Sequence, residues 1–255
     1  MKLAFCFLTR GDLLQEKTWQ AFFARASCQN YNLYCHPKEP ALVTGPVLRN
    51  RIIKNLVPTQ YLHVSIVKAI LNLFIEAYRD DLKNEYFLLI SESTIPIVPF
   101  SHLYDHLCKQ SFRSLIGYRV VPPGQTSDYQ RLFTVREWMR FAKPFYKHHA
   151  WVVLHRRHVS VLLDHPGLTL FSNAYNPDEH YFMNVLVHLL GASLDQFANH
   201  SPTFTNWHDP DIKPYHDRAT GRILNTRHPK TYYKLSKADI DQAMMIITGF
   251  FARST

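Results

Sequence analysis

The sequence predicts an α/β protein whose central sheet is mostly parallel and flanked by helices. Short apolar runs alternate with segments of helical periodicity over the first 120 residues, as in chains that pass from strand to strand through a helix. The run Tyr86–Ile90 is apolar throughout, which is typical of a strand covered on both faces. With 255 residues, 46% apolar and 19% charged, the chain can bury a core, and we expect a single domain over 1–255.

Strands are expected where apolar or β-branched residues run together between turn residues. These runs are Leu3–Thr9, Tyr31–Cys35, Ile52–Leu56, Tyr86–Ile90, Ser114–Tyr118 and Ala150–Leu154. Helices are expected where apolar residues recur every three or four positions. These segments are Leu13–Ala26, Tyr61–Tyr78, Ser101–Lys109, Arg156–Leu163, Pro177–Leu190 and a last helix that starts at Ser236 and includes Phe251.

Ligands of such sheets bind at the carboxyl ends of the strands. The loops that follow the first, second and central strands are Thr9–Asp12, His36–Lys38 and Ser91–Ile97. Residues 198–232 are polar and rich in His and Pro, with little periodicity, and irregular stretches of this length are usually functional or mobile. We therefore expect a binding site that involves these segments.

The chain is basic, with 29 Lys and Arg against 20 Asp and Glu. An excess of this size favours nucleic acid, anionic lipid or a phosphorylated ligand as partner, although solvated basic faces explain it equally well. No run of five basic residues occurs, and basic residues form no stripe interleaved with aromatics. A basic nucleic-acid-binding protein therefore stays an alternative, and no nucleic-acid partner is expected.

Apolar runs and cysteines suggest the compartment. No run reaches the roughly 18 residues of a membrane helix, and Leu3–Leu8 is too short for a secretory leader. Cys6 and Cys35 fall on neighbouring predicted strands and could pair in an oxidising compartment, but without a leader we expect free buried thiols. The expectation is a soluble, cytoplasmic protein without a transmembrane segment.

Common catalytic motifs are missing. The chain contains no Gly-x-Gly-x-x-Gly, phosphate-binding P-loop, His-Glu-x-x-His or Gly-x-Ser-x-Gly sequence. The Asp-x-Asp triplets Asp209–Asp211 and Asp239–Asp241 do not follow a buried strand, and the late histidines lack the spacing of zinc ligands. Neither a bound metal nor another cofactor is expected.

The sharpest local feature is Asn176–Tyr181, which reads Asn-Pro-Asp-Glu-His-Tyr. Proline and acidic residues suit the first turn of a helix, where Asp178 can cap the free amides. A carboxylate placed at a cleft can also act as a general base that takes a proton from a sugar hydroxyl. Both interpretations stay open on these residues alone.

A set of segments along the chain forms one ordered pattern. They are Leu3–Gly11, Trp19 with Phe22 and Phe23, Tyr31–His36, Val64–Leu71, Phe87–Phe100, Lys147–Arg156, Asp178–Tyr181, Phe204–Trp207 and His228 with Pro229. Each segment alone is a weak signal, but their order along the chain is specific. Taken in order, they resemble the core-2/I-branching enzyme family of glycosyltransferases, which includes the peptide O-xylosyltransferases.

The resemblance implies a GT-A-like fold, with a nucleotide-sugar-binding half at about 1–120 and an acceptor-binding and catalytic half at about 121–255. It implies transfer of a sugar from a UDP-sugar to a hydroxyl of a glycan or protein acceptor, with inversion and without a divalent metal. N-acetylglucosamine and xylose are the expected donor sugars. Animal members are Golgi membrane proteins, so a Golgi location is expected only if an anchor has been removed.

The resemblance also implies site residues. Glu179 would be the general base, and UDP would contact Thr9, Arg10, His36, Arg222, Arg227 and Lys230. Acceptor or donor-sugar contacts would come from Ser91, Glu92, Lys147, His148, Trp151 and Asp178. Two departures stand out: Pro37 and Lys38 replace an acidic residue frequent in the family, and His148 and His149 replace Gly-Ser. An inactive glycosyltransferase-fold binding protein is the second alternative, which the presence of Glu179 disfavours.

Overall fold

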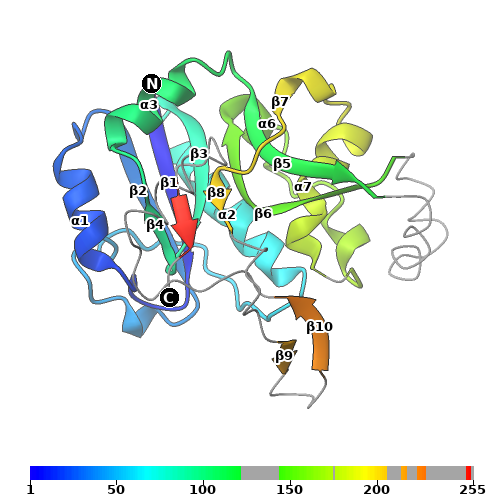
Figure 1. Cartoon of the computed structure of the whole chain (residues 1–255), viewed down its shortest axis with the longest axis horizontal. Helices are drawn as coiled ribbons and strands as arrows, with labels where there is room; N and C mark the ends of the chain where they lie inside the picture. The colour runs from blue at the N-terminus through cyan, green and yellow to red at the C-terminus, as the bar shows by residue number, and fades with distance from the viewer. Residues whose placement is uncertain (122–143, 175, 206–213, 217–222, 228–250, 254–255) are drawn as a thin grey trace.

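The computed structural model describes residues 1–121, 144–174 and 176–205, together with the backbones of three short strands at 214–216, 223–227 and 251–253. Its centre is a six-stranded sheet with strand order β2-β1-β3-β6-β5-β7 (Figure 1). The strands are β1 (Lys2–Thr9), β2 (Tyr31–Pro37), β3 (Asn84–Ser91), β5 (Ser114–Val120), β6 (Tyr146–His155) and β7 (Phe197–Ala198).

The sheet is mixed, with most of its strands in one direction as predicted and one strand reversed. β1 pairs in parallel with β2 and β3, and β5 pairs in parallel with β7, but β6 is antiparallel to both β3 and β5. β6 thus runs against the other strands of this sheet. Its first residues lie at the edge where β1, β2, β3 and β5 end, which brings Lys147 to that edge.

Helices cover both faces of the sheet. The larger ones are α1 (Glu16–Ala24), α2 (Ser65–Asp80) and α3 (Phe100–Cys108). The shorter ones are α6 (Arg156–Ser160), α7 (Tyr181–Asn184), the 3₁₀ turns η1 (Pro40–Leu42), η3 (Leu168–Phe171), η4 (Pro177–Glu179) and η6 (Leu194–Gln196), and the π-helical η5 (Val185–Leu189). Two smaller sheets join β4 (Thr94–Pro96) to β8 (Thr203–Phe204) through β11 (Phe251–Arg253), and β9 (Pro214–His216) to β10 (Ile223–Arg227).

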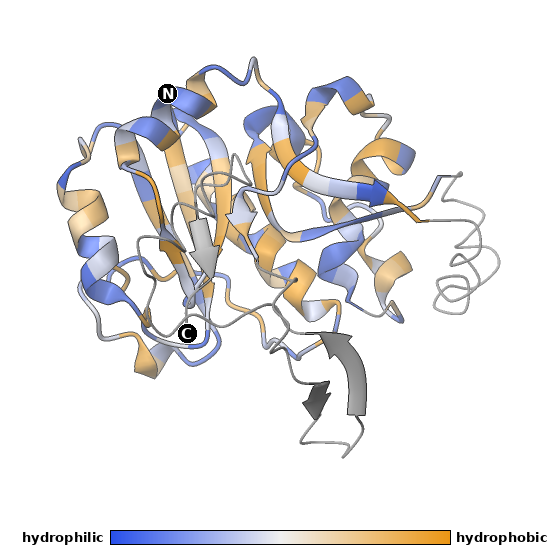
Figure 2. Ribbon diagram, in the orientation of Figure 1, coloured by the Kyte–Doolittle hydropathy of each residue, from blue (hydrophilic) through white to orange (hydrophobic). Residues whose placement is uncertain are grey.

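Alternation along β1 explains why its sequence is apolar throughout. Ala4 and Cys6 belong to the core cluster that contains the buried face of α2, whereas Phe5 and Phe7 belong to the cluster that contains α1 and α3. Because both faces are covered, every second residue is apolar on each side, and the central strands form the hydrophobic centre in Figure 2. Trp19 packs edge-on against Phe5 and Phe7 and donates its indole N–H to the Thr94 carbonyl at 2.9 Å.

Arg156 belongs to a segment that resembles the family, and in the structure its side chain makes contacts that hold the fold together. Its guanidinium lies 3.9 Å from the centre of the Tyr78 ring and donates to the carbonyls of Tyr78 and Asn84, each at 3.0 Å. The side chain thereby joins the carboxyl end of α2 to the start of β3. Five fixed donors on a planar cation suit this bridging role.

Several predicted elements were wrong in extent or type; the helix predicted at Arg156–Leu163, for instance, ends at Ser160. Ile52–Leu56 is no strand and makes one isolated bridge, between Ile52 and Cys35. Pro177–Leu190 is divided into a 3₁₀ turn, a short α-helix and a π-helical turn. Phe251, expected on the last helix, lies in β11; the rest of that helix, from Ser236, lies outside the described residues.

The cysteine expectation is confirmed. Cys6 and Cys35 are buried free thiols on adjacent strands. Cys6 is in register with Tyr34 while Cys35 is in register with Phe7, so the two thiols face opposite sides of the sheet and cannot pair. Within the described residues, none of the helices has the length and apolar character required to cross a bilayer.

Candidate active site

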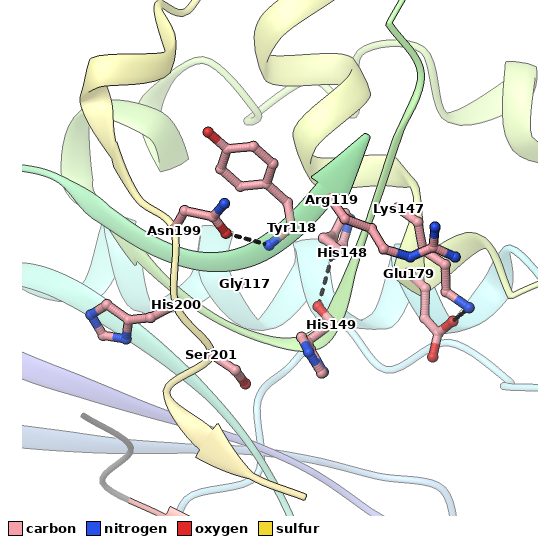
Figure 3. A pocket seen from close by; sticks show the side chains of 10 residues that line it. All are labelled: Gly117, Tyr118, Arg119, Lys147, His148, His149, Glu179, Asn199, His200 and Ser201. Carbon is pink, nitrogen blue, oxygen red and sulfur yellow. Dashed lines mark hydrogen bonds and ion pairs between the residues drawn. The ribbon is translucent and has the colours of Figure 1, made fainter. Parts of the chain in front are cut away.

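A cavity of about 520 Å³ opens at the edge where β5 ends and β6 begins. Figure 3 shows its lining from close by, and the contributions come from β5, β6, η4 and the segment after β7. The lining residues are Gly117, Tyr118, Arg119, Lys147, His148, His149, Glu179, Asn199, His200 and Ser201. Three predicted site residues, Lys147, His148 and Glu179, are among them.

Glu179 and Lys147 form the central ion pair of this cavity. The Lys147 Nζ lies 3.0 Å from the Glu179 Oε2, and both side chains are partly buried. Glu179 is fixed by the turn η4, where its amide donates to the Asn176 carbonyl at 2.9 Å. Asn176 has a left-handed backbone with φ of 49°, and Pro177 then starts the turn. Local geometry thus aims the Glu179 carboxylate at the first residues of β6.

Irregular pairing between β5 and β6 shapes the cavity. Between the pairs Ile116–Val152 and Tyr118–His148, β6 uses four residue steps where β5 uses two. The extra residues displace His149 toward the cavity, opposite Gly117. A Cβ atom on Gly117 would lie 2.8 Å from the Ser201 amide nitrogen and 2.9 Å from the His149 Cδ2. The bulge and the glycine therefore fit each other, a common combination beside active sites.

His148 joins β6 to α7 rather than presenting a free ring. Its Nε2 accepts the Phe182 amide at 3.2 Å, so its Nδ1 carries the proton and donates to the His149 carbonyl at 2.8 Å. Burial lowers the pKa of His148 to about 3, which keeps the ring neutral. The neutral form is the one that can make both bonds.

Asp178 is the residue before Glu179 in the sequence, and it is not part of the cavity lining. Burial, reinforced by the neighbouring charge of Glu179, raises the pKa of Asp178 to about 6. The adjacent carboxyl groups therefore differ in environment: one is held by a lysine, and the other is disfavoured as an anion. Divergent environments of this kind separate the roles of two neighbouring acids.

The other predicted contacts lie at the ends of β1, β2 and β3. Thr9 is buried, and its hydroxyl lies 3.7 Å from the Cys35 sulfur. Arg10 is exposed, and its Nε lies 2.8 Å from the Glu39 Oε1. His36 is fully buried, and its Nε2 accepts the Val57 amide at 3.0 Å. These side chains are at the expected edge of the sheet, and their part in nucleotide binding stays a prediction.

The turn after β3 is held largely by its own hydroxyls. Ser91 Oγ lies 2.9 Å from Thr94 Oγ1, and the Glu92 carbonyl accepts the Leu14 amide at 3.1 Å. Trp151 is partly buried and packs against the core cluster, away from the cavity lining. Arg227 ends β10, whose side chains are not described, and Arg222 and Lys230 lie outside the described residues.

Sequence reasoning missed Arg119, Asn199 and Gly117. Asn199 accepts the Tyr118 amide at 2.8 Å and so holds the end of β5 beside β7. Arg119 is the first charged residue after the apolar run of β5, and a cation at a strand end was an available signal. In the described part of the chain, no group of three or more His, Cys, Asp or Glu side chains is arranged to hold a metal ion.

The fold is a mixed sheet flanked by helices, and a carboxylate held by a lysine lies in a cavity at the strand ends. This arrangement is consistent with an enzyme that activates a hydroxyl. The sequence matches the family described as Core-2/I-Branching enzyme over residues 3–244. The chain belongs to this family of glycosyltransferases, which confirms the resemblance predicted from the ordered segments.

The relatives set the limits of the comparison. "Glycosyltransferase BC10" of Oryza sativa subsp. japonica is 25% identical over 271 residues, covering 93% of this chain and 63% of the rice protein. The chain thus spans less than two thirds of that relative's length. Among solved structures, "Crystal Structure of A197 from STIV" is 10% identical and covers 63% of this chain and 68% of that chain, with a TM-score of 0.28. A likeness at that score carries no argument.

Proposed function

We propose that this chain is an inverting, metal-independent glycosyltransferase of GT-A-like architecture that moves a sugar from a UDP-sugar to a hydroxyl of a glycan or protein acceptor. N-acetylglucosamine or xylose is the proposed donor sugar. One observation carries the proposal: the family carboxylate, Glu179, lines the cavity and is held at 3.0 Å by Lys147. A fixed carboxylate in a cavity is what general-base activation of a hydroxyl requires.

In the proposed reaction, the acceptor oxygen attacks the anomeric carbon as Glu179 takes its proton. A new carbon–oxygen bond forms while the bond from that carbon to UDP breaks, and UDP leaves with both electrons of that bond. Attack from the face opposite UDP inverts the configuration. Cationic side chains would stabilise the developing charge on the diphosphate in place of a metal.

The donor would lie across the ends of β1 to β3. Thr9 and Arg10 are the proposed uridine contacts, whereas the buried His36 would hold the chain at Val57 beneath the nucleotide. Arg222, Arg227 and Lys230 are the proposed diphosphate contacts. Ser91 ends β3 and Glu92 follows it, between the proposed nucleotide site and the cavity.

Replacing Glu179 by Gln tests the base directly. The amide keeps the shape of the carboxylate and cannot take a proton, so transfer should fall by about 100-fold or more. UDP affinity, measured by calorimetry, should stay within about twofold of the starting protein if the base acts in the chemical step alone. Asp195→Asn, on the exposed η6 turn, is the matched control for loss of an acidic group. Full activity of Glu179→Gln would show that Glu179 is not the general base.

Titration of the protein with UDP in excess EDTA tests metal independence. Micromolar binding supports cationic side chains as the diphosphate site. Binding that requires added manganese would retain the transferase and overturn the metal-independent mechanism. No binding under either condition would favour an inactive member of the family that serves as a binding protein.

A further inference from the structure

Arg119 is a cationic residue of the cavity lining to which the proposed mechanism gives no role. It lies near the end of β5, directly opposite Lys147 in the β5–β6 register. Both side chains line the cavity, and Figure 3 shows them beside Glu179. Two cations therefore stand on neighbouring strands at the position where the acceptor hydroxyl would be activated.

Like charges directly opposite each other on antiparallel strands are destabilising. Glu179 compensates Lys147 through the 3.0 Å ion pair. Arg119 makes no hydrogen bond or ion pair with another residue in the described ranges 1–121, 144–174 and 176–205. Its charge is permanent, and its five N–H donors suit a carboxylate, sulfate or phosphate. The cavity thus holds one cation more than its own carboxylate balances.

The field of these cations reaches the protein interior. Burial lowers the pKa of His180 to about 4, and the charges of Lys147 and Arg119 act in the same direction. Asn199 accepts the Tyr118 amide through its Oδ1, which leaves its side-chain N–H donors on the same lining. Arg119 supplies charged donors for an incoming anion, and Asn199 supplies neutral ones.

Sheet order separates this cation from the proposed nucleotide site. β5 is separated from β3 by β6 and from β1 by a further strand. At roughly 4.8 Å per strand, Arg119 lies on the order of 14 Å from the end of β1. The two positions suit the two ends of a reaction complex, and under the proposed function the β5 side would be the acceptor side.

We propose that Arg119, next to Lys147, forms a subsite for an anionic group on the acceptor, so that the acceptor is an acidic glycan carrying a carboxylate, sulfate or phosphate. This inference rests on the proposed function for the identity of acceptor and donor. Arg119 is a specificity-determining residue in it, and Glu179 remains the base.

Matched sugar probes test the subsite by binding. Methyl β-glucuronide and methyl β-glucoside differ only in the carboxylate and are titrated by saturation-transfer NMR in the presence of UDP. The glucuronide should bind about 10- to 100-fold more tightly, the range for a hydrogen bond to a charged group. Arg119→Gln should abolish that preference, and Arg119→Lys should restore part of it.

Arg79→Gln is the control, because Arg79 is an exposed arginine of α2 outside this cavity. It should leave the preference unchanged. A glucuronide that binds no better than the glucoside, or an equal preference in Arg119→Gln, overturns the subsite. If Arg119→Gln instead weakens UDP-glucuronic acid relative to UDP-glucose, the anion lies on the donor and the acceptor assignment is wrong.

The two proposals fail separately. A protein that binds UDP and needs Glu179 for transfer, but shows no Arg119-dependent anion preference, retains the transferase and loses the acidic acceptor. A protein with that preference but without UDP binding retains the anion subsite and loses the transferase.

Discussion

The two ends of the sheet's functional edge differ in how their polar groups are engaged. At β1 to β3, Thr9 lies against Cys35, Arg10 pairs with Glu39 and Ser91 bonds Thr94. At β5 and β6, polar groups surround a cavity, and their central contact is one ion pair between strand and turn. At the first end these polar groups contact one another, while at the second end charged side chains line a cavity.

Under the proposed function, this contrast would assign UDP binding and the chemical step to different strands. Changes at β5–β6 should alter the rate of transfer, and changes at β1–β2 should alter UDP affinity. Each prediction below measures both quantities or uses stability as a third readout, from the largest expected effect to the smallest.

Lys147→Met should have the largest effect. The Glu179 Oε2 is buried and would lose its partner, so the carboxylate would reorient. Transfer should fall by about 10- to 100-fold, since displacements of about 1 Å can cost a hundredfold, while UDP affinity should change little. Steady-state kinetics and calorimetry measure the two, with the exposed Lys109→Met as control. A loss confined to UDP affinity would reverse the roles of the two ends.

His148→Gln should flatten the pH dependence of stability. The pKa of His148 is lowered from its ordinary value of 6.5 to about 3 in the folded protein, so its stabilising effect is present above pH 6.5 and lost as the pH falls toward 3. Between pH 7 and pH 5 the native ring should contribute about 2 kcal/mol of that loss.

Urea unfolding at pH 7, 6 and 5 measures this effect in the parent and in His148→Gln. The free energy of unfolding should fall less steeply with decreasing pH in the variant, because Gln does not titrate. Parallel curves would show that His148 is protonated in the folded state and that its bond to the Phe182 amide is not maintained.

Arg10→Gln should have the smallest effect on the fold. Its ion pair with Glu39 is exposed, and such pairs contribute about 0 to 1 kcal/mol to stability. Under the proposed function, the dissociation constant for UDP should rise by about three- to tenfold, while the rate at saturating donor stays unchanged. A rate loss equal to that of Lys147→Met would erase the distinction between the two ends.

The strands that the sequence predicted best are those that are buried on both faces. β1 and β3 are covered on both faces, so their apolar runs identify them directly. Ile52–Leu56 has a comparable pattern, yet the Asn55 carbonyl accepts from Asn72 and the Val57 amide donates to His36. Side chains there take the bonds that a neighbouring strand would otherwise make, and a linear pattern cannot reveal this.

The sequence predicted residues of the candidate site, but it did not predict which of them contact each other. Glu179 and Lys147 were both expected from the resemblance, but their ion pair joins positions 32 residues apart through the reversed direction of β6. The strand–helix alternation predicted the strands that run in one direction, whereas the reversal of β6 leaves no periodic signal in the sequence. The extra residues of β6 opposite Gly117, which place His149, have no periodic signature and needed the structure.

Gly117 gives the cavity a property that can change independently of the chemistry. An added methyl group there would press on the backbone of Ser201, which cannot move as freely as a side-chain end. Alanine or serine at this position would therefore narrow the cavity while leaving the Glu179 carboxylate in place. Under the proposed function, the size of the acceptor that the cavity admits would then depend on a single methyl group.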